Sequence, residues 1–288
     1  GVQACALPIS ALVGASTAQL ANDTWADRLA LVLMQRAQLV LGDTTVHRHE
    51  RLWYDLLDRL RLPEGHVPGM AAMLGTGLSL GRPHVVYLPF KFFCCRDGRG
   101  SRGFLPTVLL SEQTPARVEV DLAPASLCLP AGVAPPASLE ARLVACAYDL
   151  QPHQRLSWLH APSADVLVED FQDCDGYNWV PLADGSGVAT RPDVRVQLHE
   201  VNLPTKYLQW VVYEDGGALF DYVPDAVASA TLFFDTNERE TGAGEWFTFG
   251  QHAWARAGRA DASRGVGVYS FALAPAELQP SGAADLLH

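Results

Sequence analysis

Short runs of strand-forming residues recur along this 288-residue chain, and they constrain its fold more than any other feature. Most of these runs are rich in Val, Leu, Tyr and Phe, and turn residues separate them. Strands that follow one another without intervening helices favour an antiparallel sandwich or barrel. The clearest runs are residues 29–34, 37–42, 84–93, 105–110, 117–122, 141–150, 164–170, 194–201, 206–214, 229–235, 245–250 and 267–274.

Two segments depart from the strand pattern and are predicted to be helices. Residues 49–62 (HERLWYDLLDRLRL) and residues 151–160 (QPHQRLSWLH) both lie between strand-like runs. In the first segment, apolar side chains recur three and four positions apart, so they share one face of a helix that can pack on a sheet. The sequence therefore predicts an all-β fold with short inserted helices. The apolar positions of the first helix are Leu52, Trp53, Leu56, Leu57 and Leu60.

The length and a weak internal repeat favour two β domains in tandem. A chain of 288 residues can form two domains or one large β domain. Residues 39–53 (LVLGDTTVHRHERLW) and residues 232–247 (LFFDTNERETGAGEWF) each combine a strand, an Asp–Thr turn, a charged stretch and a Trp, and a Val-Tyr strand follows each of them. We place the boundary after the strand that ends near residue 150, which predicts domains over residues 1–151 and 152–288.

The composition argues against several functional classes. The net charge of −11 argues against a surface that binds nucleic acid directly. No apolar stretch is long enough to predict a membrane span. The cysteines contain no CxxC pair and fit no zinc module, so we expect small buried side chains in a reducing compartment. They are Cys5, Cys94, Cys95, Cys128, Cys146 and Cys174.

No catalytic motif is recognisable, and neither a cofactor nor a metal site is predicted. The chain has no GxSxG elbow and no Walker loop, and residues 75–81 (GTGLSLG) are predicted to be a loop. The strongest metal candidate is residues 47–50 (HRHE), because His47 and His49 would share one face of an extended strand. No third ligand is identifiable nearby in the sequence, and a helix is expected to begin here. A turn with polar packing is therefore the favoured interpretation.

Acidic residues gather in the stretch EDFQDCDGYNW (169–179). A solvated loop after a strand is the favoured interpretation. The remote alternative is a carbohydrate-binding or carbohydrate-cleaving β-sandwich, which requires these carboxylates to converge in a pocket lined by aromatic side chains. The residues concerned are Glu169, Asp170, Asp173, Asp175, Tyr177 and Trp179.

Two further motifs have little specificity. Asn22 opens an Asn-Asp-Thr glycosylation sequon, which chance explains equally well. Residues 96–103 (RDGRGSRG) form an Arg- and Gly-rich stretch that could touch a neighbouring subunit or a phosphate. Solvation in an exposed loop is the default interpretation of that stretch.

Several segments match motifs of one known family, in the same order along the chain. Residues 268–282 (VYSFALAPAELQPSG) are similar to a Tyr-Ser-Phe-Ala-Leu strand that leads into Gln-Pro-Ser-Gly, and residues 202–212 (NLPTKYLQWVV) are similar to a Pro-x-Lys-x-Leu-x-Trp strand. Residues 38–53, 85–120 and 143–172 extend the match. Together they resemble the double jelly-roll major capsid proteins of the nucleocytoplasmic large DNA viruses. The motif residues are Pro204, Lys206, Trp210, Tyr269, Phe271, Gln279, Pro280, Ser281 and Gly282.

The resemblance implies two tandem antiparallel jelly rolls of the eight-stranded type and a structural, non-enzymatic role in the virion. It implies a homotrimer that forms pseudo-hexagonal capsomers, which tile an icosahedral shell assembled in the host cytoplasm. Its partners would be neighbouring capsomers, minor capsid proteins and, indirectly, an underlying viral membrane. Family members are usually longer, so we expect that strands are missing at both ends. A minor capsid or scaffolding protein of the same fold is the alternative.

The motif at residues 267–282 leads to a specific expectation about packing. In a strand, Tyr269, Phe271 and Leu273 point to the same side, so we expect all three to pack in the core of the second sandwich. Pro275 and the residues up to Gly282 are expected to lead the chain into a loop.

Overall fold

The chain is described by a computed structural model and divides into two compact units. The first unit comprises residues 1–170 and 213–221, and the second comprises residues 171–212 and 222–288. The assignment of strands to two β domains with a boundary after residue 151 stays a prediction. The structure describes residues 2–12, 24–80, 83–95, 105, 107–110, 115–130, 133, 138–147, 149–160, 168–172, 194–198, 201–214, 217–254, 264–275 and 281–286.

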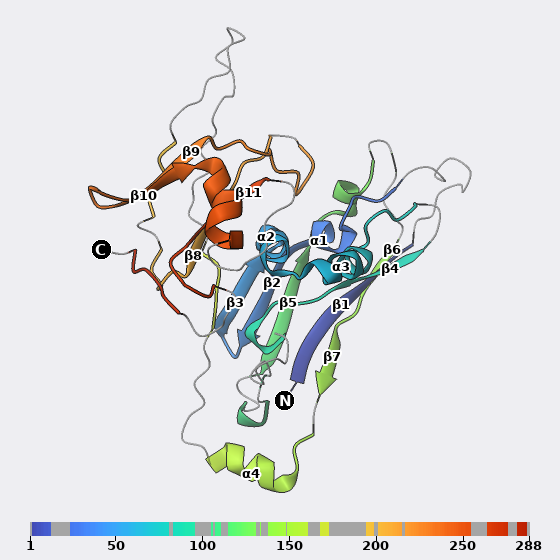
Figure 1. The fold of residues 1–288 in the computed structure, drawn as a ribbon. Coiled ribbons are helices and arrows are strands. Elements are labelled where there is room, and N and C mark those ends of the chain that lie inside the picture. The colour runs from blue at the N-terminus through green and yellow to red at the C-terminus, as the bar shows by residue number, and fades with distance from the viewer. Residues whose placement is uncertain are drawn as a thin grey trace. The chain divides into compact units, whose positions relative to one another are not determined.

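Two antiparallel sheets provide the framework of the first unit (Figure 1). In one sheet, the second strand lies between the third and the fifth. In the other, the first strand pairs with the fourth and, along successive parts of its length, with the sixth and the seventh. The strands are β1 (Val2–Leu12), β2 (Met34–Leu41), β3 (Thr44–Glu50), β4 (His84–Leu88), β5 (Ala116–Leu122), β6 (Ser138–Ala141) and β7 (Val144–Ala147).

Among the described residues of the first unit, four α-helices and several short 3-10 turns lie between these strands or follow the last of them. Both predicted helices are confirmed, and α1 contacts both α2 and α3. The helices are α1 (Leu29–Leu33), α2 (Arg51–Arg61), α3 (Val67–Leu74) and α4 (Pro152–His160). The 3-10 turns are Glu64–His66, Phe93–Cys95, Thr107–Leu109 and Ala125–Cys128.

One predicted strand is a helix and another is shorter than expected. The strand predicted over 29–34 is wrong, because Leu29–Leu33 form α1 and β2 begins only at Met34. All five residues of α1 are buried, so this run has no polar face that could distinguish a helix from a strand. The strand predicted over 84–93 ends at Leu88, directly before Pro89, which has no N–H to donate to a neighbouring strand.

Four other strand predictions are wrong for the residues that the structure describes. Residues 168–170, at the end of the strand predicted over 164–170, have no regular secondary structure. Thr107–Leu109 is a 3-10 turn within the strand predicted over 105–110. Trp246–Trp254 is a π-helical segment where a strand was expected to cover 245–250. Residues 194–198 have no regular secondary structure. Short apolar runs suit buried helices and buried strands equally well, so periodicity could not separate them.

The amphipathic helix α2 buries one carboxylate together with its apolar face. Asp55 is fully buried, and Arg59 Nε donates a hydrogen bond to its Oδ2 at 2.8 Å. Arg28, directly before α1, forms a second ion pair with Asp55. Arg59 also donates to the carbonyl oxygen of Phe220 at 2.7 Å. Asp55 therefore joins α2 to the start of α1, and Arg59 joins α2 to residues 213–221 of the same unit.

The second unit contains two strand pairs and a π-helical segment. β8 (Tyr207–Val211) pairs with β11 (Val266–Ser270), and β9 (Ser229–Phe234) pairs with β10 (Asn237–Ala243), both antiparallel. Phe247, in the π-helical segment, is buried in contact with β11.

The indole ring of Trp210 lies directly over Gly267. The register of β8 and β11 places these residues opposite each other. A Cβ atom built on Gly267 would lie 2.3 Å from two ring atoms of Trp210, which is far inside van der Waals contact. Phe247 packs against the same indole with ring centroids 5.3 Å apart. A glycine at 267 therefore makes room for this aromatic contact.

Tyr269, Phe271 and Leu273 were all expected to pack in the core, and this is fully correct only for Tyr269. Tyr269 is buried and Phe271 is partly buried, but the side chain of Leu273 is 67% exposed. Val268 and Ser270, which alternate with Tyr269, are buried as well. β11 is thus buried on both faces and ends at Ser270, so the alternation no longer holds when the chain reaches Leu273.

Replacing Asp55 by Asn should lower the free energy of unfolding by about 3–5 kcal/mol, because two arginines would lose a buried partner. Urea denaturation measures this change. The matched control is Asp121→Asn, which removes the partner of Arg36 in an exposed ion pair and should cost about 0–1 kcal/mol. Equal effects of the two substitutions would contradict the structural role of Asp55.

Gly267→Ala should destabilise the protein by about 1–3 kcal/mol, because the added methyl group overlaps the Trp210 ring. Thermal denaturation, followed by Trp fluorescence, measures the effect. Gly69→Ala serves as the control, since a Cβ at this position in α3 meets nothing within 4 Å. The control should be neutral or stabilising by up to about 1 kcal/mol. A Gly267→Ala protein as stable as the parent would show that the indole can move aside at no cost.

Candidate functional site

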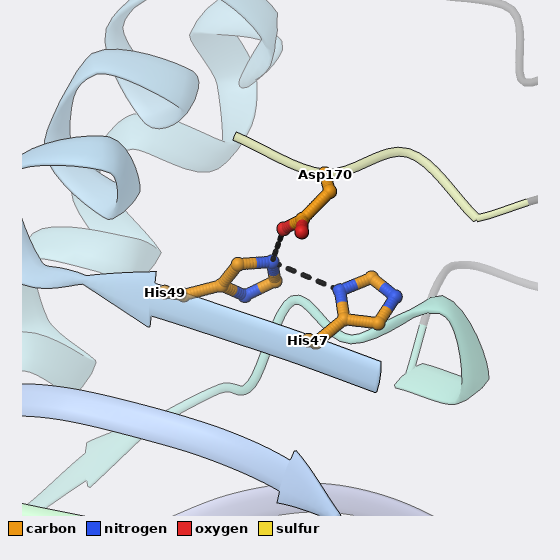
Figure 2. A group of neighbouring side chains, drawn as sticks. All are labelled: His47, His49 and Asp170. Carbon is orange, nitrogen blue, oxygen red and sulfur yellow. Dashed lines mark hydrogen bonds and ion pairs between the residues drawn. The ribbon is translucent and has the colours of Figure 1, made fainter. Parts of the chain in front are cut away.

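Two histidines on β3 face each other inside the first unit (Figure 2). His47 and His49 occupy alternate positions of the strand, so their side chains lie on the same face. Both are fully buried, and His47 Nδ1 lies 2.9 Å from His49 Nε2. The turn expected here is wrong, because the pair belongs to a regular strand in register with β2.

The third member of this cluster comes from a distant part of the chain. Asp170 Oδ1 lies 3.7 Å from His49 Nε2, and one donor atom from each of the three residues lies within 4.8 Å of the others (Figure 2). The Asp170 side chain is 32% exposed, so the cluster reaches solvent on this side. Sequence spacing could not reveal this ligand, because only the tertiary fold brings residues 168–172 to β3.

The carboxylate beside Asp170 is also held by the first unit. Glu169 Oε1 accepts a hydrogen bond from Arg61 Nη2 at 2.6 Å, and Glu169 Oε2 accepts one from Arg61 Nη1 at 3.4 Å. Both side chains are mostly buried. The expected solvated loop is therefore wrong for Glu169, which binds α2 through a bidentate ion pair. The other members of that acidic and aromatic stretch, residues 173–179, lie outside the described part of the chain.

An aromatic shell surrounds the two imidazoles. His49 stacks on Trp53 with ring centroids 4.2 Å apart and on Phe92 at 5.5 Å. His47 lies 5.6 Å from the ring of Phe93. Burial raises the pKa of the neighbouring Tyr54, so this phenol stays neutral. The rings exclude water from the histidines and restrict their orientation.

The cluster offers two imidazole nitrogens and one carboxylate oxygen. This set of donors suits a borderline divalent transition metal better than Mg²⁺ or Ca²⁺, which prefer oxygen ligands. Without a metal, the contact between His47 and His49 fits an N–H···N hydrogen bond in which one ring donates.

In the second unit, the structure brings the two family-like motifs together. The carbonyl oxygen of Lys206, directly before β8, accepts hydrogen bonds from the N–H groups of Phe271 at 2.8 Å and Ala272 at 3.1 Å. Thr205 and Ala284 exchange two backbone hydrogen bonds, at 2.8 and 2.9 Å. The chain at the end of the motif at residues 268–282 therefore lies beside the beginning of the Pro-x-Lys-x-Leu-x-Trp motif.

Ser281 and Gly282, the Ser-Gly pair of the motif, each have a structural role in this reversal of the chain. The Ser281 hydroxyl accepts a hydrogen bond from the Ala274 N–H at 2.6 Å. A Cβ on Gly282 would lie 2.7 Å from the carbonyl oxygen of Phe271, so only glycine fits without a shift. Pro204 is exposed. Gln279, Pro280 and the possible glycosylation site Asn22 lie outside the described residues.

The three cysteines whose side chains the structure describes are buried or partly buried, as expected. Cys94 and Cys128 are buried, and Cys95 is partly buried, all with free thiols. Burial raises the pKa of Cys128 to about 11, which keeps this thiol protonated and unreactive. A hydrogen bond with the Cys95 thiol lowers the pKa of Cys94. The Arg- and Gly-rich stretch at 96–103 is outside the described residues.

None of the helices among the described residues is long and apolar enough to cross a bilayer.

The fold is similar to those of solved viral capsid proteins. A crystal structure of VP54 from PBCV-1, fitted into a cryo-EM reconstruction of the virophage Sputnik, matches with a TM-score of 0.71 and 21% identity, over 99% of this chain and 74% of that chain. A quasi-atomic model of the PBCV-1 capsid matches with a TM-score of 0.69 and 19% identity, over 99% and 74%. The Faustovirus major capsid protein matches with a TM-score of 0.60 and 9% identity, over 99% and 79%.

The sequence itself matches a family model. No curated protein sequence shows significant similarity to the chain. The model of the major capsid protein N-terminus, in contrast, matches residues 5–152, which is more than half of the chain. This match includes α2 and the His47–His49 pair. The chain therefore belongs to the major capsid protein family, whose members are structural proteins of the virion rather than enzymes.

Proposed function

We propose that the chain is the repeating subunit of the icosahedral shell of a large DNA virus, built as a double jelly roll that trimerises into a pseudo-hexagonal capsomer. The single observation that carries the proposal is the family match over residues 5–152. The fold similarity to PBCV-1 and Faustovirus capsid proteins over 99% of the chain supports it.

The strand arrangement is compatible with two jelly rolls in tandem. A jelly roll packs two antiparallel sheets over one core. The first unit has two antiparallel sheets, and the second has two antiparallel strand pairs. Two jelly rolls per chain and three chains per capsomer would present six similar blocks, a shape that tiles a flat facet. Three-fold closure needs only one heterologous contact, repeated three times.

Exposed apolar side chains in the first unit supply surface for such contacts. Leu156 and Leu159 are 54% and 52% exposed on α4, and Leu109 is exposed on the 3-10 turn that contacts α4. Val85 and Tyr87 are exposed on β4. Side chains of this kind, grouped on one helix, are typical of surfaces that another subunit covers.

The proposal extends to partners and place of assembly. The net charge of −11 favours contact with other capsid proteins over contact with the genome. We therefore expect neighbouring capsomers and minor capsid proteins as direct partners, and a viral membrane beneath the shell as an indirect one. Assembly would take place in the host cytoplasm.

The purified protein should form a homotrimer at micromolar concentration. Size-exclusion chromatography with light scattering measures the mass directly, and a stable monomer at that concentration would count against the capsomer.

The copy number of the chain in purified virions distinguishes a major capsid protein from a minor capsid or scaffolding protein. A major capsid protein should dominate the virion protein, whereas a minor component or a scaffold would be scarce or absent.

Leu156→Glu combined with Leu159→Glu should weaken the trimer, because two carboxylates would have to be desolvated at a subunit contact. We expect the dissociation constant to rise by at least about tenfold, the effect of losing about 1.4 kcal/mol. Sedimentation velocity over a concentration series measures it.

The matched control is His153→Glu, which adds a carboxylate to an exposed position of the same helix. The control should trimerise as the parent does. If the double variant also assembled normally, α4 would not belong to the trimer interface.

A further inference from the structure

We propose that His47, His49 and Asp170 form a structural binding site for one Zn²⁺ ion in the first unit (Figure 2). This inference is independent of the assembly proposed above. It rests on the position of three donor atoms, their surroundings and the chemistry of the donors.

The donor separations are close to those around a tetrahedral zinc ion. Zinc binds His nitrogen at about 2.0–2.1 Å and carboxylate oxygen at about 2.0–2.2 Å, so neighbouring ligand atoms lie roughly 3.3 Å apart. The distance between the two histidine nitrogens is 2.9 Å, and that from His49 Nε2 to Asp170 Oδ1 is 3.7 Å. These two values lie on either side of the expected separation, and all three donors lie within 4.8 Å of one another, so side-chain adjustments that bring Asp170 and His47 closer together would complete the geometry.

An apolar shell surrounds two of the three donors. The aromatic rings of Trp53, Phe92 and Phe93 enclose the two imidazoles and exclude competing water. Such an apolar shell, together with fixed ring orientations, strengthens metal binding. The Asp170 carboxylate is partly exposed, so an ion can reach the cluster from solvent, and a water molecule would serve as the fourth ligand.

The ion pair between Arg61 and Glu169 brings the third ligand into position. Glu169 is bound at 2.6 Å to α2, which follows β3 without a break, and Asp170 is the next residue. The backbone of the third ligand is therefore held near the histidines by a contact that does not involve the metal. Bound zinc would tie residues 168–170 to β3, beside the contact that Glu169 makes with α2.

Zinc binding would replace the hydrogen bond between the two histidines. The proton that bridges the two rings would move to the other nitrogen of its own imidazole, so that each neutral ring presents a lone pair to the ion.

The test is calorimetric titration of Zn²⁺ into protein stripped with EDTA, with Co²⁺ as a spectroscopic probe. We expect one ion per chain, a visible Co²⁺ spectrum typical of tetrahedral coordination, and a higher melting temperature with Zn²⁺ than with EDTA. Absence of both a binding isotherm and a melting shift would overturn the proposal.

Variants identify the ligands. Asp170→Asn and His49→Gln should each weaken zinc binding by more than about tenfold, since even residues that only orient a ligand contribute 10–100-fold. The controls are Asp121→Asn and His66→Gln, which change exposed side chains of the same kinds and should bind zinc as the parent does. Because His49 is buried and its variant could fail to fold, the partly exposed Asp170 decides. Unchanged affinity in Asp170→Asn would refute the site.

Discussion

The buried carboxylate of Asp55 is the interaction on which the first unit depends. A charge without solvent must be paired, and Asp55 is paired by Arg28 and Arg59. These contacts hold α2 against the start of α1, and Arg59 extends the network to the carbonyl of Phe220. Since α2 begins where β3 ends, the same helix also determines where Arg61 and the two histidines lie.

The buried polar groups described above hold segments of the chain in place and have no part in catalysis. In the first unit, Arg61 holds Glu169, and His49 faces Asp170, so two adjacent carboxylates tie residues 168–170 to α2 and β3. A capsid subunit must present its contact surfaces in a constant geometry, and charged groups that fit only one arrangement contribute to it. Zinc bound to His47, His49 and Asp170 would likewise hold these segments in one arrangement.

In the second unit, backbone hydrogen bonds and two glycines allow the chain to pack closely. Gly267 admits the Trp210 indole, and Gly282 admits the Phe271 carbonyl. The hydrogen bonds of Lys206 and Ser281 close the segment on itself. The described residues of the motif at 268–282 therefore contribute to the fold through packing and backbone contacts.

Local periodicity and ordered motifs predicted the strand-rich class, the positions of both inserted helices and the family. They did not predict that Leu29–Leu33 and Trp246–Trp254 are helical, since short apolar runs suit either conformation when they are buried. Three-dimensional packing alone places Leu273 at the surface and brings Asp170 to the two histidines. Contacts between residues far apart in the chain leave no signal in the spacing of a single sequence.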